Sequence, residues 1–122
     1  MTLAVQVCES CKDPDPAKRQ HATGGGRRLL HELNALASAG ALPSQIVVRA
    51  YSCLGNCERR CRLSVAGEGR WSWVFGDLDP ILDVEPLLEF LRRWRKSPDG
   101  FLPKEDRPEG LRTKLLGRVP PS

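Results

Sequence analysis

The chain has 122 residues, of which 40% are hydrophobic and 28% are charged, and its formal net charge is +4. This composition is typical of one folded domain and excludes an intrinsically disordered chain. The sequence contains no run of about 18 apolar residues, and its N-terminus lacks the basic start and apolar stretch of a signal peptide. We therefore predict a cytoplasmic protein that does not span a membrane.

The positive charge comes largely from arginine-rich groups at positions 27–28, 59–62 and 92–96. Such groups suit an acidic partner protein or nucleic acid, but no nucleic-acid-binding motif accompanies them. We expect most of this charge to be solvated surface, and we do not predict a nucleic-acid partner.

The five cysteines fall into two clusters, Cys8 with Cys11 and Cys53 with Cys57 and Cys61. Thiols stay reduced in the cytoplasm, so clustered cysteines there indicate metal ligands or redox groups rather than disulfides. An odd number of cysteines would also leave one thiol unpaired in any disulfide scheme. The two clusters are therefore the candidate functional residues of the chain.

The first half of the chain predicts a strand, a loop, a helix and a second strand. Residues 3–7 are rich in β-branched side chains and end at polar turn residues, which indicates a strand. Two prolines and three glycines between residues 13 and 26 favour an exposed loop. Apolar side chains at helical spacing predict a helix over residues 27–39. Residues 45–52 form the second strand, and the apolar run Ile46–Val48 predicts a central position covered on both faces.

The second half predicts a β-hairpin and a second helix. Residues 62–66 and 70–75 alternate in polarity around a short glycine turn, as hairpin strands do. Trp71, Trp73 and Phe75 share one face of the second hairpin strand, which is typical of core packing. Asp79 before Pro80 is typical of a helix start, and apolar spacing continues that helix to about residue 96.

These elements divide the chain into a domain over residues 1–100 and an extended C-terminal tail over residues 101–122. Their order is βαβ followed by ββα, which is the layout of a thioredoxin-like domain. We therefore predict an α/β fold, a single thioredoxin-like domain with a mixed four-stranded sheet. A βαβ crossover makes its two strands parallel, so their carboxyl ends meet at one edge of the sheet. This topology should bring the two cysteine clusters within about 5–10 Å of each other.

Four converging thiolates suit either a tetrahedral zinc ion or an iron–sulfur cluster. We take Cys8, Cys11, Cys53 and Cys57 as the first-choice metal ligands, with Cys61 replacing Cys11 as the second choice. Nearby cations would offset the negative charge of a four-thiolate cluster and attract an acidic redox partner. These cations are Arg59, Arg60 and Arg62.

The strand followed by Cys53-Leu-Gly-Asn-Cys57 resembles the second half-site of thioredoxin-like 2Fe–2S ferredoxins, which also occurs in the small subunit of bacterial respiratory complex I. The cysteine motifs, residues 71–80, Ser97-Pro-Asp-Gly100 and Arg118-Val-Pro-Pro121 are also similar to an uncharacterised bacterial family of predicted metal-binding proteins. These resemblances imply a thioredoxin-like fold and a metal or 2Fe–2S site. Two departures concern the ligand set: only two residues separate Cys8 from Cys11, and Cys61 is an additional thiol.

The leading functional hypothesis is a 2Fe–2S protein of ferredoxin type, an electron carrier or a participant in cofactor metabolism rather than an enzyme. Its partner would be a redox protein, and a homodimer is also compatible with the sequence. The first alternative is a structural or regulatory zinc site. A thiol–disulfide oxidoreductase using Cys8 and Cys11 is less favoured, because Pro14 and Pro16 oppose the helix that activates such thiols. His21 and His31 have no nucleophile or carboxylate at a suggestive spacing, so the sequence does not indicate conventional catalysis.

Overall fold

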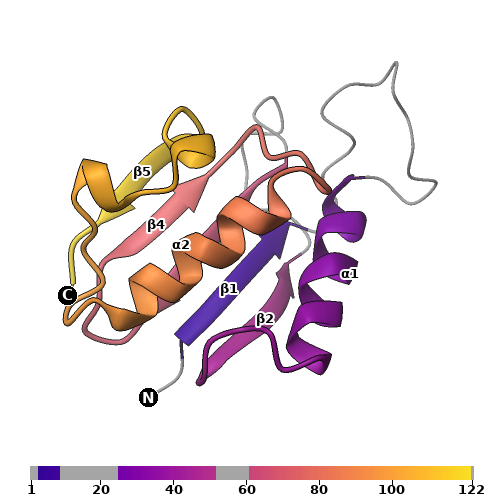
Figure 1. Ribbon diagram of the computed structural model, residues 1–122, viewed down its shortest axis with the longest axis horizontal. Coiled ribbons are helices and arrows are strands. Elements are labelled where there is room, and N and C mark those ends of the chain that lie inside the picture. Colours follow the sequence, from indigo (N-terminus) through magenta and orange to yellow (C-terminus); the bar gives the residue numbers. More distant parts are fainter. Residues whose placement is uncertain (1–2, 9–24, 52–60, 122) are drawn as a thin grey trace.

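A computed structural model describes residues 3–8, 25–51 and 61–121 (Figure 1). The elements in chain order are β1 (Leu3–Cys8), α1 (Gly25–Ser38), β2 (Ile46–Tyr51), β3 (Leu63–Gly67), β4 (Ser72–Phe75), α2 (Val84–Lys96), the 3₁₀ turns η3 (Lys104–Asp106) and η4 (Glu109–Leu111), and β5 (Leu115–Val119). In this part of the chain, no helix has the length and apolar character needed to cross a bilayer.

The strands form one mixed sheet in the order β2-β1-β3-β4-β5. β1 and β2 are parallel, and every other neighbouring pair is antiparallel. The predicted α/β class, the mixed sheet and the parallel βαβ unit are therefore confirmed. The number of strands is corrected from four to five.

The fifth strand comes from the segment for which the sequence predicted an extended tail. β5 pairs antiparallel with β4, with a register irregularity between Val74 and Phe75. Leu102 and Leu111, on the chain leading to β5, are 5% and 1% exposed and belong to the core. This segment therefore packs against the domain and extends its sheet.

β2 lies at an edge of the sheet, so its predicted central position is wrong. Ile46 is 8% exposed, whereas Val47 is 40% exposed because it lies on the face opposite Ile46. β1 is the central strand of the two, because it lies between β2 and β3, and its Leu3, Ala4 and Val5 are all buried. Both β1 and β2 contain a continuous apolar run, which is typical of a central strand, but of these two only β1 has a neighbouring strand on each side.

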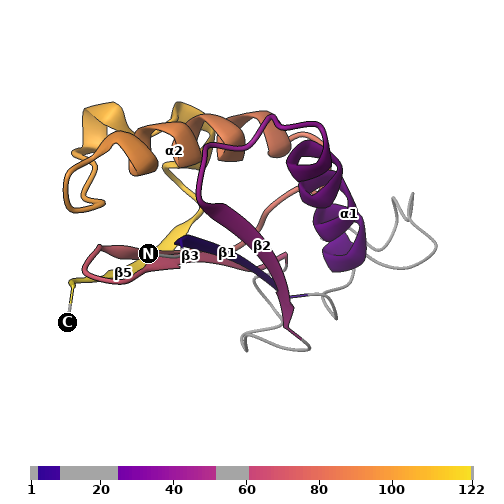
Figure 2. The same cartoon turned by 90° about the horizontal axis from the view of Figure 1, so that it is seen from below.

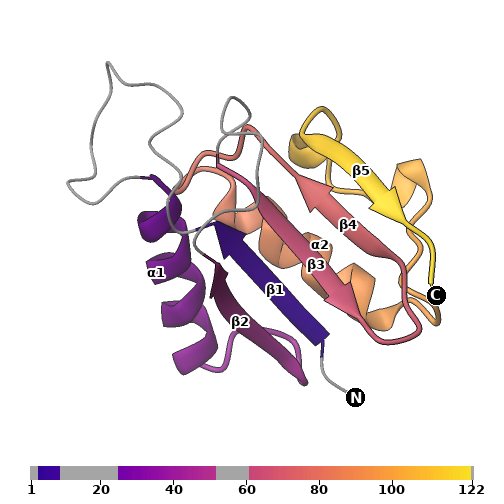
Figure 3. The same cartoon turned by 180° about the vertical axis from the view of Figure 1, so that it is seen from behind.

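Both helices pack on the same face of the sheet, and the core lies between these two layers (Figure 2). Figure 3 shows the opposite face of the sheet, where β1 lies between β2 and β3. Edge-to-face contacts join Trp73 of β4 and Phe90 of α2 at 5.5 Å, and Phe75 and Phe90 at 5.0 Å between ring centroids. Trp73 and Phe75 are buried, which confirms their predicted core role, and Trp71 is partly buried.

Arg70, in the β3–β4 turn, closes the C-terminal end of α2. Its guanidinium donates hydrogen bonds to the carbonyl oxygens of Trp94 and, at 2.9 Å, of Ser97. The side chain is 7% exposed, and burial, followed by the charge of Arg95, lowers the pKa of the guanidinium. A buried cation at a helix C-terminus satisfies carbonyl groups that the helix leaves without partners and interacts favourably with its dipole.

We expect Arg70→Met to lower the free energy of unfolding by about 2 kcal/mol, because hydrogen bonds from a charged group contribute about 1.5–3 kcal/mol. Urea denaturation of the variant measures this loss. Arg92→Met is the matched control, because Arg92 is an exposed α2 arginine whose only described ion pair is with Glu89, at 3.4 Å. Equal stability losses in the two variants would contradict a capping role for Arg70.

Candidate metal centre

Cys8 is the last residue of β1 and lies at the carboxyl edge of the parallel pair. Its amide donates a hydrogen bond to the carbonyl oxygen of Arg62 at 3.2 Å, which continues the β1–β3 pairing. Its side chain is 1% exposed and belongs to the core cluster. One predicted ligand is therefore a buried thiol held on a central strand.

Cys61 lies at the same edge of the sheet, two residues before β3 begins. Its amide donates to the carbonyl oxygen of Leu78 at 3.3 Å, and its own carbonyl accepts from the Leu78 amide at 3.2 Å. Its side chain is fully buried. Because Cys8 pairs with the residue that follows Cys61, the structure places Cys61 beside the end of β1, just before the neighbouring strand β3 begins.

Cys11, Cys53 and Cys57 lie outside the described residues, as do Arg59 and Arg60. The end of β2 gives the position from which the segment that carries Cys53 continues. Cys8 is in register with Tyr51, the last residue of β2, and Cys53 comes two residues later. Two residues span at most about 7 Å and neighbouring strands lie about 4.8 Å apart. β1 and β2, the strands that lead into the two cysteine clusters, therefore end side by side, as the βαβ topology predicted.

Both helices begin at this edge of the sheet (Figure 1). α1 starts at Gly25, directly after the connection from β1, and its first turn contains no acidic residue. α2 starts at Val84, and the chain before it pairs with Cys61 through Leu78. A helix N-terminus carries a partial positive charge that stabilises nearby anions. The N-terminus of α1 therefore suits a negatively charged group at this edge, whereas α2 has Asp83 at its N-cap and Glu85 in its first turn.

Hydrogen bonds to Asp79 and Asp83 stabilise the turn between Leu78 and helix α2. The Asp79 carboxylate accepts from the amides of Ile81 and Leu82, both at 2.8 Å, so it caps the turn before α2. The predicted helix start at Asp79 is corrected, because α2 begins at Val84. Asp83 occupies the N-cap position but makes no side-chain cap bond. It accepts instead from the Asp79 amide at 2.7 Å and forms an ion pair with Lys114.

The Asp83–Lys114 pair joins the start of α2 to the chain just before β5. The Asp83 side chain is 9% exposed and that of Lys114 is 24% exposed. The Lys114 carbonyl also accepts from the Gly76 amide at 2.9 Å. Sequence reasoning missed this contact, because the two residues are 31 positions apart and no local spacing links them.

We expect Lys114→Met to cost about 2 kcal/mol of stability, because it leaves a nearly buried carboxylate without its cation. Chemical denaturation at neutral pH measures the change. Lys104→Met, at an exposed position in η3, is the control and should change stability by less than about 0.5 kcal/mol. A Lys114 variant as stable as this control would show that the pair contributes no stability.

Within residues 3–8, 25–51 and 61–121, no three His, Cys, Asp or Glu side chains gather so that they could hold a metal ion. His31 is exposed on α1. His21 lies outside the described residues. A metal centre at this edge would therefore need thiols from the cysteine-bearing segments that follow β1 and β2.

A family model described as "Protein of unknown function (DUF1636)" matches residues 5–121. The chain belongs to the DUF1636 family. This confirms the resemblance to an uncharacterised family that the motifs indicated. No curated protein matches the sequence.

Among solved structures, the chain is similar to a thioredoxin-like [2Fe–2S] ferredoxin from Aquifex aeolicus, with a TM-score of 0.56 and 16% sequence identity. The match covers 98% of this chain and 94% of the ferredoxin. At this identity the similarity shows the fold alone. This member of the DUF1636 family therefore has the thioredoxin-like fold that the order of its elements predicted.

Proposed function

We propose that this protein holds a 2Fe–2S cluster at the carboxyl edge of β1 and β2 and acts as an electron carrier of ferredoxin type. The observation that carries the proposal is the pair of buried cysteines at this edge, Cys8 at the end of β1 and Cys61 just before β3. The fold similarity to a protein described as a thioredoxin-like [2Fe–2S] ferredoxin supports it.

The residues at this edge fit such a group chemically. A 2Fe–2S cluster takes four cysteine thiolates, and the chain has five, all in the two segments that leave this edge or return to it. We keep Cys8, Cys53 and Cys57 as ligands. Cys11 remains the first choice for the fourth ligand, and the position of Cys61 next to the end of β1 supports it as the alternative.

The surroundings of the edge favour an anionic centre that changes charge. When bound, the cluster supplies a site that accepts and releases one electron. The N-terminus of α1, whose first turn has no acidic residue, contributes partial positive charge at this edge, and Arg62 lies on the β3 side. Positive charge stabilises the reduced, more negative state, so these groups would raise the reduction potential. The burial of Cys8 and Cys61 limits solvent access to their sulfur atoms.

The visible spectrum of protein purified anaerobically from iron-replete cells tests this proposal. We expect a brown protein with absorption bands in the visible range that dithionite bleaches. A colourless, iron-free preparation would refute the cluster, and one zinc ion per chain in that preparation would favour the structural zinc site instead.

A further inference from the structure

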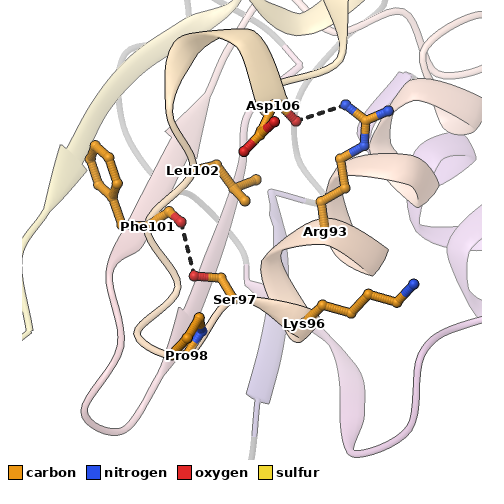
Figure 4. A pocket seen from close by; sticks show the side chains of 7 residues that line it. All are labelled: Arg93, Lys96, Ser97, Pro98, Phe101, Leu102 and Asp106. Carbon is orange, nitrogen blue, oxygen red and sulfur yellow. Dashed lines mark hydrogen bonds between the residues drawn. The ribbon is translucent and has the colours of Figure 1, made fainter.

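A surface cavity of about 430 Å³ lies at the C-terminal end of α2 (Figure 4). Its charged residues are Arg93, Lys96 and Asp106, and Arg93 is already paired with Glu89 at 3.0 Å. Arg93 also donates to the carbonyl oxygen of Asp106 at 2.8 Å. The lining therefore indicates no particular ligand. The structural feature that bears on the proposed centre lies before the other end of α2, in the chain that follows β4.

The chain that follows β4 has one residue more than the chain opposite it, as in a β-bulge. The register of β3 and β4 pairs Leu63 with Phe75, the last residue of β4. The next contact joins Cys61 to Leu78 through backbone hydrogen bonds in both directions. One residue therefore separates the two pairs on the β3 side, and two residues separate them on the β4 side. Such an inserted residue bends the strand and changes the direction of the side chains that follow it.

Gly76 and Asp77 are the two residues on the longer side. The Gly76 amide donates to the carbonyl oxygen of Lys114, just before β5, at 2.9 Å. The Leu78 amide donates in the opposite direction, to the carbonyl oxygen of Cys61 at 3.2 Å. In a regular strand, amides two residues apart point to the same neighbouring strand. The direction is reversed here at Asp77, whose backbone is left-handed with a φ of 55°.

Aspartate suits this backbone conformation, which most other residues disfavour. Asp and Asn adopt positive φ several times more often than other non-glycine residues, and β-branched residues adopt it rarely. In the part of the chain that the structure describes, the other non-glycine residue with positive φ is Gln45, with a φ of 70°. Gln45 precedes Ile46, which is in register with Leu3 at the start of β1 and is therefore about 17 Å from the Cys8 end of that strand. Gln45 thus provides a comparison that is remote from the cysteines.

We propose that Asp77 is a positioning residue for the cluster, because its left-handed backbone holds Leu78 against Cys61 and so fixes the point at which the segment that carries Cys57 returns to the sheet. Leu78 and Cys61 are both 0% exposed, so this contact is made in the core. Cys57 is a ligand in both candidate ligand sets, and residues that hold ligand-bearing segments in place tune a metal centre. This inference rests on the proposed cluster, but the contact between Cys61 and Leu78 can be tested without it.

Replacing Asp77 with valine tests the proposal, because a β-branched residue disfavours the left-handed backbone. In anaerobically purified protein reduced with dithionite, we expect Asp77→Val to shift the electron paramagnetic resonance g-values and to lower iron per chain by about half or more. Asp77→Ala should show the same changes to a smaller extent. Asp77→Asn and Asp77→Gly permit the left-handed backbone, so we expect both to keep the wild-type spectrum.

Gln45→Val is the matched control, since it opposes the same backbone conformation at the other end of the sheet. We expect it to lower the melting temperature and to leave the g-values and the iron content unchanged. Equal spectral changes in the Gln45 and Asp77 valine variants would overturn the proposal, because both would then reflect general destabilisation. A wild-type spectrum in Asp77→Val, or a valine-like spectrum in Asp77→Gly, would also overturn it.

Alkylation of Cys61 by iodoacetamide, measured by mass spectrometry, gives a readout that needs no cluster. We expect Asp77→Val to speed this reaction about tenfold, because the Cys61 thiol is fully buried and local opening exposes it. Gln45→Val should change the rate less than about twofold. Faster alkylation in Asp77→Val alone, in protein without iron, would refute the proposed cluster and retain the contact that Asp77 positions. Unchanged alkylation would refute that contact.

Discussion

Replacing Cys8 with serine is expected to remove at least nine-tenths of the bound iron and the visible absorption with it. Cys8 is the last residue of β1, its side chain is 1% exposed, and it is in register with Tyr51 at the end of β2. Serine is almost the same size but is a poor ligand for iron in such clusters, where thiolates bind. Iron and absorbance per chain, measured on anaerobically purified protein, check this result.

Ala4→Ser is the matched control for the Cys8 variant. Ala4 also lies on β1, is 6% exposed and shares a face of that strand with Cys8. Its replacement places a hydroxyl group on the same strand, so it reports any general damage to the sheet. We expect this control to keep its iron. Equal loss of iron from both variants would mean that Cys8 acts through folding rather than as a ligand.

The same measurement decides between the two candidates for the fourth ligand. If Cys11 is the ligand, Cys11→Ser loses the cluster and Cys61→Ser keeps it, and the pattern is reversed if Cys61 is the ligand. In the second case the hydrogen bonds between Cys61 and Leu78 would fix the backbone of a ligand. Full iron content in both variants would refute a four-cysteine centre that uses either residue.

Replacing Trp73 with alanine is expected to lower the free energy of unfolding by about 3–5 kcal/mol, the usual cost of removing a large buried aromatic side chain. Trp73 is fully buried and lies 5.5 Å from Phe90 and 6.2 Å from Phe101 between ring centroids. Its indole nitrogen donates to the carbonyl oxygen of Gly100 at 2.9 Å. This one side chain therefore joins β4, α2 and the segment that leads to β5.

Denaturant unfolding of Trp73→Ala and Trp73→Phe separates packing from hydrogen bonding. We expect the phenylalanine variant to retain most of the aromatic packing and to lose about 1–2 kcal/mol, mainly through the missing indole donor. A loss below about 1 kcal/mol for Trp73→Ala would contradict the central packing role of this residue.

The parts of the fold that follow from local pattern and chain topology could be predicted from the sequence. The helical spacing before Ser38 and before Lys96 located α1 and α2, and alternation around Gly67 located the β3–β4 hairpin. The right-handed βαβ rule then required β1 and β2 to be parallel. The same rule predicts that β1 and β2 end at a common edge of the sheet.

The parts that depend on long-range pairing could not be predicted. β5 contains Gly117 and precedes two prolines, which is a typical loop composition, and it becomes a strand because β4 offers a free edge. The edge position of β2 depends on whether β3 pairs with β1 or with β2, and hydrophobicity alone does not distinguish these. Likewise, nothing local to Cys61 indicates its pairing with Leu78.

The most direct test of the proposed centre is the amount of iron, acid-labile sulfide and zinc per chain in anaerobically purified protein. A 2Fe–2S cluster predicts about two iron atoms and two sulfide ions per chain, with zinc well below one per chain. One zinc ion per chain without sulfide, or metal-free protein, would contradict the proposal.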